Sequence, residues 1–594
     1  MSLLFKAGAA LSGLLLLGVA GCGQTPPPSA SAARPLSPAS EQWAKITKGF
    51  IDSYLTAQPF FAAQAGRHEF DGQMPDLSAH GIKREIARLH DQRDQLSAVD
   101  PSTLLPNEQF DREYLLTVVD RDLFWIEKAR YPFSNPYWYL GNLDPDMYLS
   151  RNYAPLEVRM KAYIKYARAI PKMVADIREN LQSPLPKTFI ELGIDDFGGF
   201  ADFYKKDVTP IFASVQDPDL QKQLTDADTA AALSMAALKE YLISIRAKGT
   251  DNFALGKDLF AQMIQQTERV NVPIEQIEAA GRADLERNTA ALKAQCAAYL
   301  PKGSIQACIA KESADKPKDG TLARAREQLV MLKEFIQKNK VVTIPSSEEA
   351  LVAEAPPYNR SNAAFIQVPG PYDHGVASVY NIAPPDPKWS KAEQAAYIPS
   401  EATLLSTSVH EVWPGHFLQF MHSNANPDKL EGLWVGYAYA EGWAHYCEEM
   451  MYEMGLEQGN PEMRIGQITD ALLRDVRLLS AIGMHTHGMT VAQSEKMFKE
   501  QAYQDPGNAR QQAARGTFDP AYLNYTLGKL MIRKLRTDWI AKRLAATPGA
   551  PAASAAPAQN QALWHDFHDE FLSHGGPPIP LLRKLMLGEE GSVL

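Results

Sequence analysis

Apolar residues recur at intervals of three and four through most of the chain between residues 41 and 338, and strand-like alternation is rare there. The segments LKEYLISIRA and AREQLVMLKEFI follow this spacing closely. At about 100° per residue, the spacing gathers apolar side chains on one face of an α-helix, and other helices must cover that face. Clusters of Pro and Gly at residues 183–187, 300–304 and 316–320 predict helix breaks. The pattern predicts a mainly α protein with a large helical body.

A short part of the chain has a different residue composition. VVTIPSS (341–347) and the segment 363–385 are rich in β-branched and aromatic residues with turn signals, which predicts a few short strands. Helices resume at about Ser400 and continue to the end, apart from a low-complexity loop at 546–560. We expect a small β-sheet beside the helices that follow it.

The chain of 594 residues is longer than one compact core usually supports. We expect either two large lobes or one extended helical body with subdomains. We therefore divide the sequence into an N-terminal signal at 1–21, a tether at 22–40, a helical region at 41–340 and a region at 341–594. The last two could form one continuous body.

The N-terminus has the features of an export signal. Lys6 precedes an apolar run from Ala7 to Ala20, which is shorter than the roughly 20 residues needed to cross a bilayer. The sequence VAGC, ending at Cys22, resembles a bacterial lipobox, and this resemblance implies a mature chain that begins at a lipid-bearing Cys22. The alternative is plain secretion with a free cysteine. Gly23 and Gln24 follow Cys22 in place of the Asp that marks inner-membrane retention in such lipoproteins.

These features predict a location in the bacterial cell envelope. The protein is expected to face the periplasm and to be anchored by lipid, with outer-membrane sorting favoured. The Pro-, Ser- and Ala-rich segment QTPPPSASAARPLSP cannot build a core and fits a tether between the anchor and the folded body.

Export also bears on the remaining cysteines. Cys296 and Cys308 flank a short connection with Pro and Gly, and in an oxidising compartment they are the natural disulfide pair. Cys447 would then be free. The alternative is that all three are small buried apolar residues.

Charge and motifs exclude several classes of function. The 70 Asp and Glu outnumber the 60 Lys and Arg, and no sustained basic stripe is present, so nucleic acid is not an expected partner. The chain has no GxSxG motif and no Gly-rich phosphate loop, and Gly198-Gly199 is a lone turn signal. Cys447 stands beside acidic residues, which disfavour a reactive thiolate.

The segment HEVWPGH (410–416) raises a question of spacing. Two histidines four apart, as in the HExxH motif, lie about 40° apart on a helix, whereas six apart they lie about 120° apart. Pro414 has no N–H for the carbonyl of His410, and its ring collides with that carbonyl in a regular helix. Gly415 can adopt backbone angles closed to other residues. We expect the helix to distort at Trp413-Pro414-Gly415 and to return His416 to the face of His410.

A catalytic zinc ion generally takes three protein ligands. Downstream, Glu441 lies in the apolar and aromatic stretch YAYAEGWAHYCEEM, where an unpaired carboxylate would be costly to bury. We therefore predict one zinc ion per chain, held by His410, His416 and Glu441, with Glu411 as general base for a water molecule.

The third ligand has rivals in the same stretch. His445 shares the helical face of Glu441, and Glu448 and Glu449 follow one turn later. Glu448 and Glu449 are expected to lie on a solvated face. His445 is interpreted as a core histidine in preference to a partner of a metal ligand.

At these residues the sequence resembles the domain of unknown function 885 family. The matching segments are HEVWPGHFLQ (410–419), AEGWAHY (440–446) and RGTFDPAYLNYTLGKLMI (515–532), and the resemblance extends over nearly the whole mature chain. It implies a helical, zinc-dependent peptidase-like fold, similar in outline to the neurolysin and peptidyl-dipeptidase clan. It also implies His410, His416 and Glu441 as ligands and Glu411 as general base.

The chain departs from the family pattern at one place. Where many relatives have Asp-Thr-Gly-x-His, this chain reads Ala481-Ile482-Gly483-Met484-His485 and lacks the supporting carboxylate. His485 is still the candidate to stabilise a developing oxyanion, with Tyr522 and Tyr525 behind it. The alternative for the two tyrosines is ordinary helix packing.

Two further roles stay open at this stage. Arg515 could bind a substrate carboxylate or pair with a nearby acid. The segment SVYNIAPP (378–385) could be an edge strand that holds an extended peptide, or an ordinary buried strand.

The function predicted best is a zinc-dependent peptidase acting on oligopeptides, with a peptide substrate and a membrane anchor as its partners. A zinc hydrolase of another amide or ester is one alternative, because only the pocket distinguishes the two. A non-catalytic metal-binding or peptide-binding lipoprotein is the other, although a structural zinc site has no use for the base Glu411. Neither the oligomeric state nor exo- versus endo-cleavage follows from the sequence.

Overall fold

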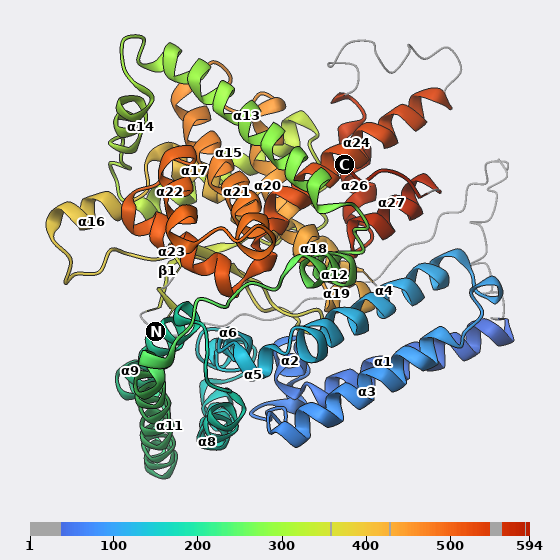
Figure 1. The fold of residues 1–594 in the computed structure, drawn as a ribbon, viewed down its shortest axis with the longest axis vertical. Helices are drawn as coiled ribbons and strands as arrows, with labels where there is room; N and C mark the ends of the chain where they lie inside the picture. Colours follow the sequence, from blue (N-terminus) through green and yellow to red (C-terminus); the bar gives the residue numbers. More distant parts are fainter. Residues whose placement is uncertain (1–36, 357–358, 361, 427–428, 547–560, 589) are drawn as a thin grey trace, which may run out of the picture.

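The fold is mainly α-helical, with one small sheet among the described residues, which confirms the predicted fold class (Figure 1). None of the described helices combines the length and apolarity needed to cross a membrane. The predicted signal peptide, Cys22 and nearly all of the tether lie outside the described residues. The computed structural model describes residues 37–356, 359–360, 362–426, 429–546, 561–588 and 590–594.

The N-terminal helices form two packed groups, drawn in blue and in teal to green in Figure 1. Helix α1 begins at Pro38 with Ser37 as its cap, so the last residues assigned to the tether are helical. The first group comprises α1 (Pro38–Ala57), α2 (Pro59–Gln64), η1 (His68–Phe70), α3 (Ala79–Ser97), η2 (Pro101–Thr103), α4 (Pro106–Leu123) and the π-helical turn η3 (Phe124–Lys128). The second comprises α5 (Tyr131–Ser134), α6 (Tyr137–Leu140), α7 (Asp146–Leu149), α8 (Leu156–Asn180), α9 (Lys187–Lys206), α10 (Val208–Phe212), α11 (Pro218–Ile245) and η4 (Arg246–Lys248).

The remaining elements form the largest part of the molecule. Four helices precede the sheet: α12 (Lys257–Glu268), α13 (Ile274–Tyr299), α14 (Ile305–Ser313) and α15 (Thr321–Asn339). The helices after it are α16 (Lys391–Tyr397), α17 (Glu401–Glu411), α18 (His416–Ala425), α19 (Lys429–Leu433), α20 (Tyr437–Glu453), α21 (Pro461–Thr486), α22 (Val491–Gln501), α23 (Pro506–Phe518), η6 (Pro520–Leu523), α24 (Asn524–Ala545), α26 (Trp564–Leu572) and α27 (Ile579–Leu587).

One hydrophobic core joins the helices on both sides of residue 340. It contains Phe260, Leu292 and Leu332 from before that residue, together with Trp443 and Leu527 from after it. Helix α13 packs along α21, and α20 packs along α24. The boundary predicted at residue 340 therefore falls inside one core, and the chain from α12 onward is one continuous body, whereas helices between residues 60 and 245 form a further core of their own.

The predicted helix breaks are confirmed. Helix α8 ends at Asn180 and α9 begins at Lys187, while the gaps between α13, α14 and α15 fall at the other two Pro- and Gly-containing segments. The structure also pairs Cys296 with Cys308 in a disulfide, with 5.7 Å between their Cα atoms, and this bond joins α13 to α14. Cys447 is free and buried.

The sheet has the strand order β1-β3-β2 and consists of β1 (Leu351–Glu354), β2 (Ala364–Gln367) and β3 (Val379–Ile382). Strand β3 pairs in parallel with β1, with Val352 opposite Tyr380, and antiparallel with β2, with Phe365 opposite Asn381. The expectation of a strand at 341–347 was wrong, because that segment forms no strand and the first strand starts at Leu351. Buried Tyr380 and Ile382 anchor the sheet to the helical core.

Candidate metal centre

The helix that carries His410 ends one residue later. Val412 has φ −123° and ψ −74°, and a new helix, α18, begins at His416. We expected a single distorted helix, and the structure has two helices joined by a tight turn. The physical cause is the one anticipated, because Pro414 cannot continue the hydrogen-bond pattern of α17.

Gly415 makes this turn possible through close approach. A Cβ atom there would lie 1.8 Å from the carbonyl oxygen of His410 and 2.4 Å from that of Val409. Its N–H instead donates to the Val409 carbonyl at 3.0 Å. The indole Nε1 of Trp443 donates to the Pro414 carbonyl at 2.8 Å and ties the turn to α20.

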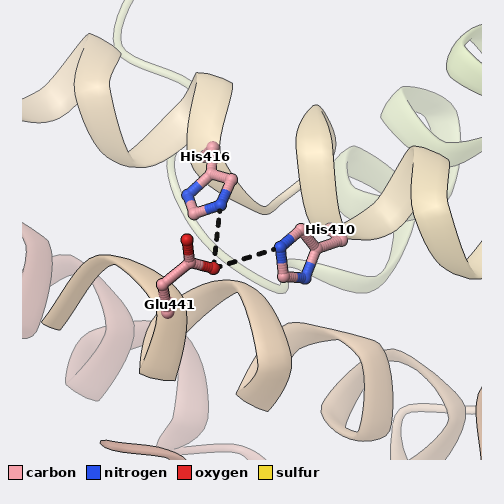
Figure 2. A group of neighbouring side chains, drawn as sticks. All are labelled: His410, His416 and Glu441. Atoms are coloured by element: carbon pink, nitrogen blue, oxygen red, sulfur yellow. Dashed lines mark ion pairs between the residues drawn. The ribbon is translucent and has the colours of Figure 1, made fainter. Parts of the chain in front are cut away.

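The turn brings three side chains from three helices together (Figure 2). Oε2 of Glu441 lies 3.4 Å from Nε2 of His410 and 3.4 Å from Nε2 of His416. One ligand atom from each residue lies within 4.8 Å of the others. A tetrahedral zinc ion with bonds of about 2.0–2.1 Å keeps its donor atoms about 3.3–3.4 Å apart. Both distances to Glu441 match this spacing, and the three residue types are common zinc ligands.

Unsatisfied polar atoms point to the same conclusion. Oε2 of Glu441 and Nδ1 of His416 are buried, and neither has a hydrogen-bond partner among the described residues. Buried polar atoms without partners are rare in folded proteins and call for an explanation such as a bound ion or water. A cation between the three side chains would satisfy the carboxylate oxygen.

The electrostatics of this cluster favour positive charge. Burial opposes a charged imidazole, but the neighbouring carboxylates of Glu441 and Glu448 outweigh it and raise the pKa of His410 to about 10. Burial likewise opposes ionisation of Glu441, yet the imidazoles of His416 and His410 hold its pKa well below the ordinary value. The surroundings thus keep Glu441 ionised and stabilise a cation beside it.

Glu448 and Arg474 fix the orientation of His410. Nδ1 of His410 lies 2.6 Å from Oε1 of Glu448, and Arg474 Nη2 pairs with the same oxygen at 3.0 Å. A proton on Nδ1 donated to Glu448 leaves Nε2 free to face Glu441, which is the usual arrangement around a metal-ligating histidine. The expectation that Glu448 and Glu449 lie on a solvated face was wrong, since both are buried.

Sequence reasoning missed the role of Glu448, although a signal was present. Glu448 follows Glu441 by seven residues, which is two helical turns and returns to the same face. His445, the rival ligand, is a buried histidine whose Nδ1 lies 3.1 Å from the other oxygen of Glu448. It is not part of the three-residue cluster.

Glu411 lies beside the cluster at the end of α17. Its Oε2 accepts a hydrogen bond from the backbone N–H of Ile366 in β2 at 3.0 Å. Burial raises its pKa, while the nearby imidazoles of His410 and His416 oppose the rise. The sheet therefore holds this carboxylate next to the candidate ligands without making it one of them.

A cavity of about 520 Å³ opens onto the cluster. Glu441 is part of its wall, and nine of the other lining residues are aromatic. The wall is built by α4, α6, the end of α12, α20 and the start of α24, so it joins the N-terminal helices to the large body. A second cavity of about 380 Å³ runs past β2, and Phe420 lines both.

The structure does not support an oxyanion role for His485. Its Nε2 lies 2.8 Å from the Gly516 carbonyl, and its Nδ1 accepts from the Leu255 N–H at 3.2 Å. The ring stacks on Phe260, and burial lowers the pKa to about 4 despite the bond to Gly516. Both nitrogens are engaged by backbone groups, so His485 has no N–H left for a substrate.

The two tyrosines differ in position. Tyr522 is fully buried in the core, and its hydroxyl oxygen would lie 2.2 Å from a Cβ atom at Gly516. Tyr525 stacks near His410, with 6.4 Å between ring centres, and meets Tyr437 edge-on at 5.8 Å. Of the residues predicted to act on an oxyanion, only Tyr525 lies beside the cluster.

Two roles were considered for Arg515 and two for the segment 378–385. Arg515 pairs with a nearby acid, and the segment forms an internal strand, not an edge strand. Arg515 pairs with Asp519 at 2.9 Å and donates to the hydroxyl of Tyr437 at 3.0 Å. The segment contains β3, which is the central strand and has partners on both sides. The edge strand nearest the cluster is β2, whose residues line the second cavity.

Two solved structures share this fold. One is a proposed lipoprotein of unknown function from Shewanella oneidensis, with 22% identity, TM-score 0.72, and coverage of 92% of this chain and 99% of that one. The other is a proposed lipoprotein from Colwellia psychrerythraea, with 18% identity, TM-score 0.74, and coverage of 93% of this chain and 99% of that one. A comparison with curated proteins gave no significant match.

A family profile described as "Bacterial protein of unknown function (DUF885)" matches residues 59–586. The match spans all three candidate ligands, Glu411 and nearly every described helix. It confirms the resemblance seen in the sequence motifs. This chain belongs to the DUF885 family of bacterial proteins.

Proposed function

We propose that this chain is a zinc-dependent peptidase that hydrolyses oligopeptides. The observation that carries the proposal is the convergence of His410, His416 and Glu441 from three helices, with Glu441 at the donor spacing of a tetrahedral zinc ion from both histidines. A site with three protein ligands leaves one position for water or substrate, as catalytic zinc sites do.

When bound, zinc would act as a Lewis acid that polarises a peptide carbonyl and acidifies water. Glu411 would accept the proton of the attacking water and pass it to the leaving amine. Its carboxyl suits this task, because burial raises its pKa above the ordinary value and so favours proton acceptance. The Ile366 N–H holds the carboxylate in place, and Tyr525 is the candidate donor to the oxyanion.

The large aromatic cavity beside Glu441 supports a peptide substrate in preference to a small ester or amide. Its volume of about 520 Å³ lies in the range of ligand pockets, and the second cavity beyond Phe420 extends the available surface along β2. Extended peptides bind exposed strand edges through their main chain, and β2 offers such an edge next to Glu411.

We further propose that the protein is anchored to the cell envelope by lipid on Cys22 and faces the periplasm, with outer-membrane sorting favoured. The lipobox-like VAGC sequence supports the anchor. The description of both structural relatives as proposed lipoproteins also supports it.

The proposal is tested by measuring cleavage of a peptide mixture with the zinc-loaded protein, with the chelated protein, and after zinc is restored. Glu411→Gln is expected to keep zinc and to lower kcat/KM by about 10²–10⁴. The control is Glu401→Gln, at the opposite end of α17, where Glu401 pairs with Arg324 at 2.6 Å. Full turnover by Glu411→Gln would remove the general-base assignment, and cleavage that survives chelation would remove zinc from the mechanism.

A further inference from the structure

The end of the cavity formed by α12 contains a buried acid that the proposed hydrolysis does not use. Glu268, the last residue of α12, is 2% exposed. Its Oε1 accepts from the Ala438 N–H at 3.4 Å and from Nδ2 of Asn524 at 3.0 Å. Its Oε2 has no hydrogen-bond partner among the described residues. One oxygen therefore holds the start of α20, and the other is unused.

Two neighbouring acceptors are also unused. Oγ1 of Thr267 and Oδ1 of Asn524 are buried and have no partner among the described residues. Thr267, Glu268 and Asn524 all line the cavity. Three unsatisfied oxygen atoms at one cavity wall are unusual, because buried polar groups are nearly always hydrogen-bonded.

The rest of this wall suits a cation. Tyr114, Trp125 and Trp434 contribute aromatic rings, and ring faces attract cations. The one basic side chain in the wall, Arg121, pairs with Asp122 at 2.9 Å. Of the other acids in the wall, Asp519 pairs with Arg515 and Glu441 belongs to the histidine cluster, whereas Glu268 has no ion pair among the described residues.

We propose that Glu268, Thr267 and Asn524 form a subsite for a primary ammonium group of the peptide substrate. Such a group has three N–H donors, which match the three unpartnered oxygens in number, and its charge is opposite to that of the Glu268 carboxylate. The inference rests on the proposed peptidase function for the identity of the ligand as a peptide.

The subsite lies close to the metal centre. Glu268 contacts the backbone of Ala438 at the start of α20, and Glu441 follows three residues later, about 4.5 Å along the helix axis. The ammonium group would then belong to a residue near the cleaved bond, either as a lysine side chain or as the free N-terminus. Both sources present the same chemistry to Glu268.

Without a ligand, the Glu268 carboxyl is mostly protonated at neutral pH. Burial raises its pKa to about 8, although the Ala438 N–H and the charge of Arg121 oppose the rise. A cation bound at Oε2 would favour the ionised carboxylate. Trp434 lines the same cavity, and its buried indole Nε1 has no hydrogen-bond partner among the described residues.

The test uses one peptide scaffold in matched pairs with the zinc-loaded full chain. Lysine is compared with norleucine at each position of an acetylated peptide, and the free N-terminus is compared with the acetylated one. The wild type is expected to prefer one ammonium-bearing peptide by about tenfold or more in kcat/KM, because loss of a buried polar contact penalises the uncharged analogue. A preference at one lysine position identifies the side chain, and a preference for the free terminus identifies the α-ammonium.

Glu268→Gln is the decisive variant, because the amide keeps an oxygen for Ala438 and Asn524 and removes the charge. It is expected to reduce the preference ratio to less than about threefold, and Thr267→Val is expected to reduce it partly. The control is Glu312→Gln, which neutralises another buried glutamate outside the cavity, one that accepts from Ser400 and Ser313. The control should keep the wild-type ratio.

Equal rates for the two members of every pair in the wild type would overturn the subsite, and so would a preference that Glu268→Gln retains. If no peptide is cleaved at all, calorimetric binding of the same pairs separates the two proposals. Tighter binding of the ammonium peptide that Glu268→Gln abolishes supports the subsite in the absence of hydrolysis. Equal binding of both peptides overturns it.

Discussion

Two buried histidines of this protein have opposite surroundings. His410 lies between the carboxylates of Glu441 and Glu448, and these raise its pKa to about 10 against the effect of burial. His485 lies among phenylalanine rings and backbone groups, and burial lowers its pKa to about 4. Their exposed fractions are 6% and 1%, so burial alone does not distinguish them. The charge of the neighbours decides which histidine suits a metal and which one packs a core.

The largest difference between the two histidines is expected when each imidazole is removed in turn. His410→Ala should weaken zinc binding by more than about 100-fold, beyond the loss typical for an outer partner of a ligand, and peptide cleavage should fall with it. His485→Ala should keep zinc but lose about 2–4 kcal/mol of unfolding free energy, through a cavity and two lost hydrogen bonds. Zinc content and denaturant unfolding measure both effects.

The assignment of the two histidines would be wrong if the two variants gave each other's expected results. Zinc loss in His485→Ala with a folded chain would mean that His485 serves the metal centre after all. Normal zinc affinity in His410→Ala would remove His410 from the ligand set.

A smaller effect is expected from the carboxylate behind His410. Glu448→Gln should weaken zinc affinity by about 10–100-fold, because the partner that orients the imidazole loses its charge. Its neighbour Glu449 is equally buried but pairs with Arg287 and Arg533, away from the ligands. Glu449→Gln is therefore the matched control, and chelator competition gives both affinities. Equal losses in the two variants would reduce Glu448 to a general structural role.

The smallest effect concerns a third histidine, His68, which pairs with two aspartates outside the metal cluster. His68 lies 3.1 Å from Asp71 and 2.9 Å from Asp373. Burial opposes its charge, but the hydrogen bonds to Asp373 and Asp71 outweigh it and raise its pKa to about 9 from 6.5. The folded state therefore binds the proton more tightly than the unfolded state.

The stabilisation by His68 should be fully present below about pH 6.5 and lost as the pH rises through about 9. Because the side chain is 30% exposed, solvent screening should limit it to about 1 kcal/mol. The difference in unfolding free energy between the wild type and His68→Gln, measured from pH 6 to 10, checks this. A difference that does not change with pH would contradict it.

The sequence was informative wherever the signal was local. Helical periodicity predicted the fold class, and Pro and Gly clusters predicted the breaks between α13, α14 and α15. The spacing of His410 and His416 around Pro414 predicted an irregular backbone, and only the extent of the interruption was underestimated.

Partners distant in the sequence were harder to predict. Whether His485 meets a substrate or the carbonyl of Gly516 depends on how α21 packs against α23, which no local pattern records. Likewise β3 became the central strand because β1 and β2 both pair with it, although its sequence also suits an edge. Glu448 was misplaced because a carboxylate is buried only when partners such as His410 and Arg474 compensate for it.

The most direct test of the account is an anomalous-scattering crystal structure of the zinc-loaded protein at the zinc absorption edge. The account predicts one strong peak per chain, bonded to Nε2 of His410, Nε2 of His416 and a carboxylate oxygen of Glu441 at about 2.0–2.2 Å. A peak at other residues, or no peak between these three side chains in zinc-saturated crystals, would contradict it.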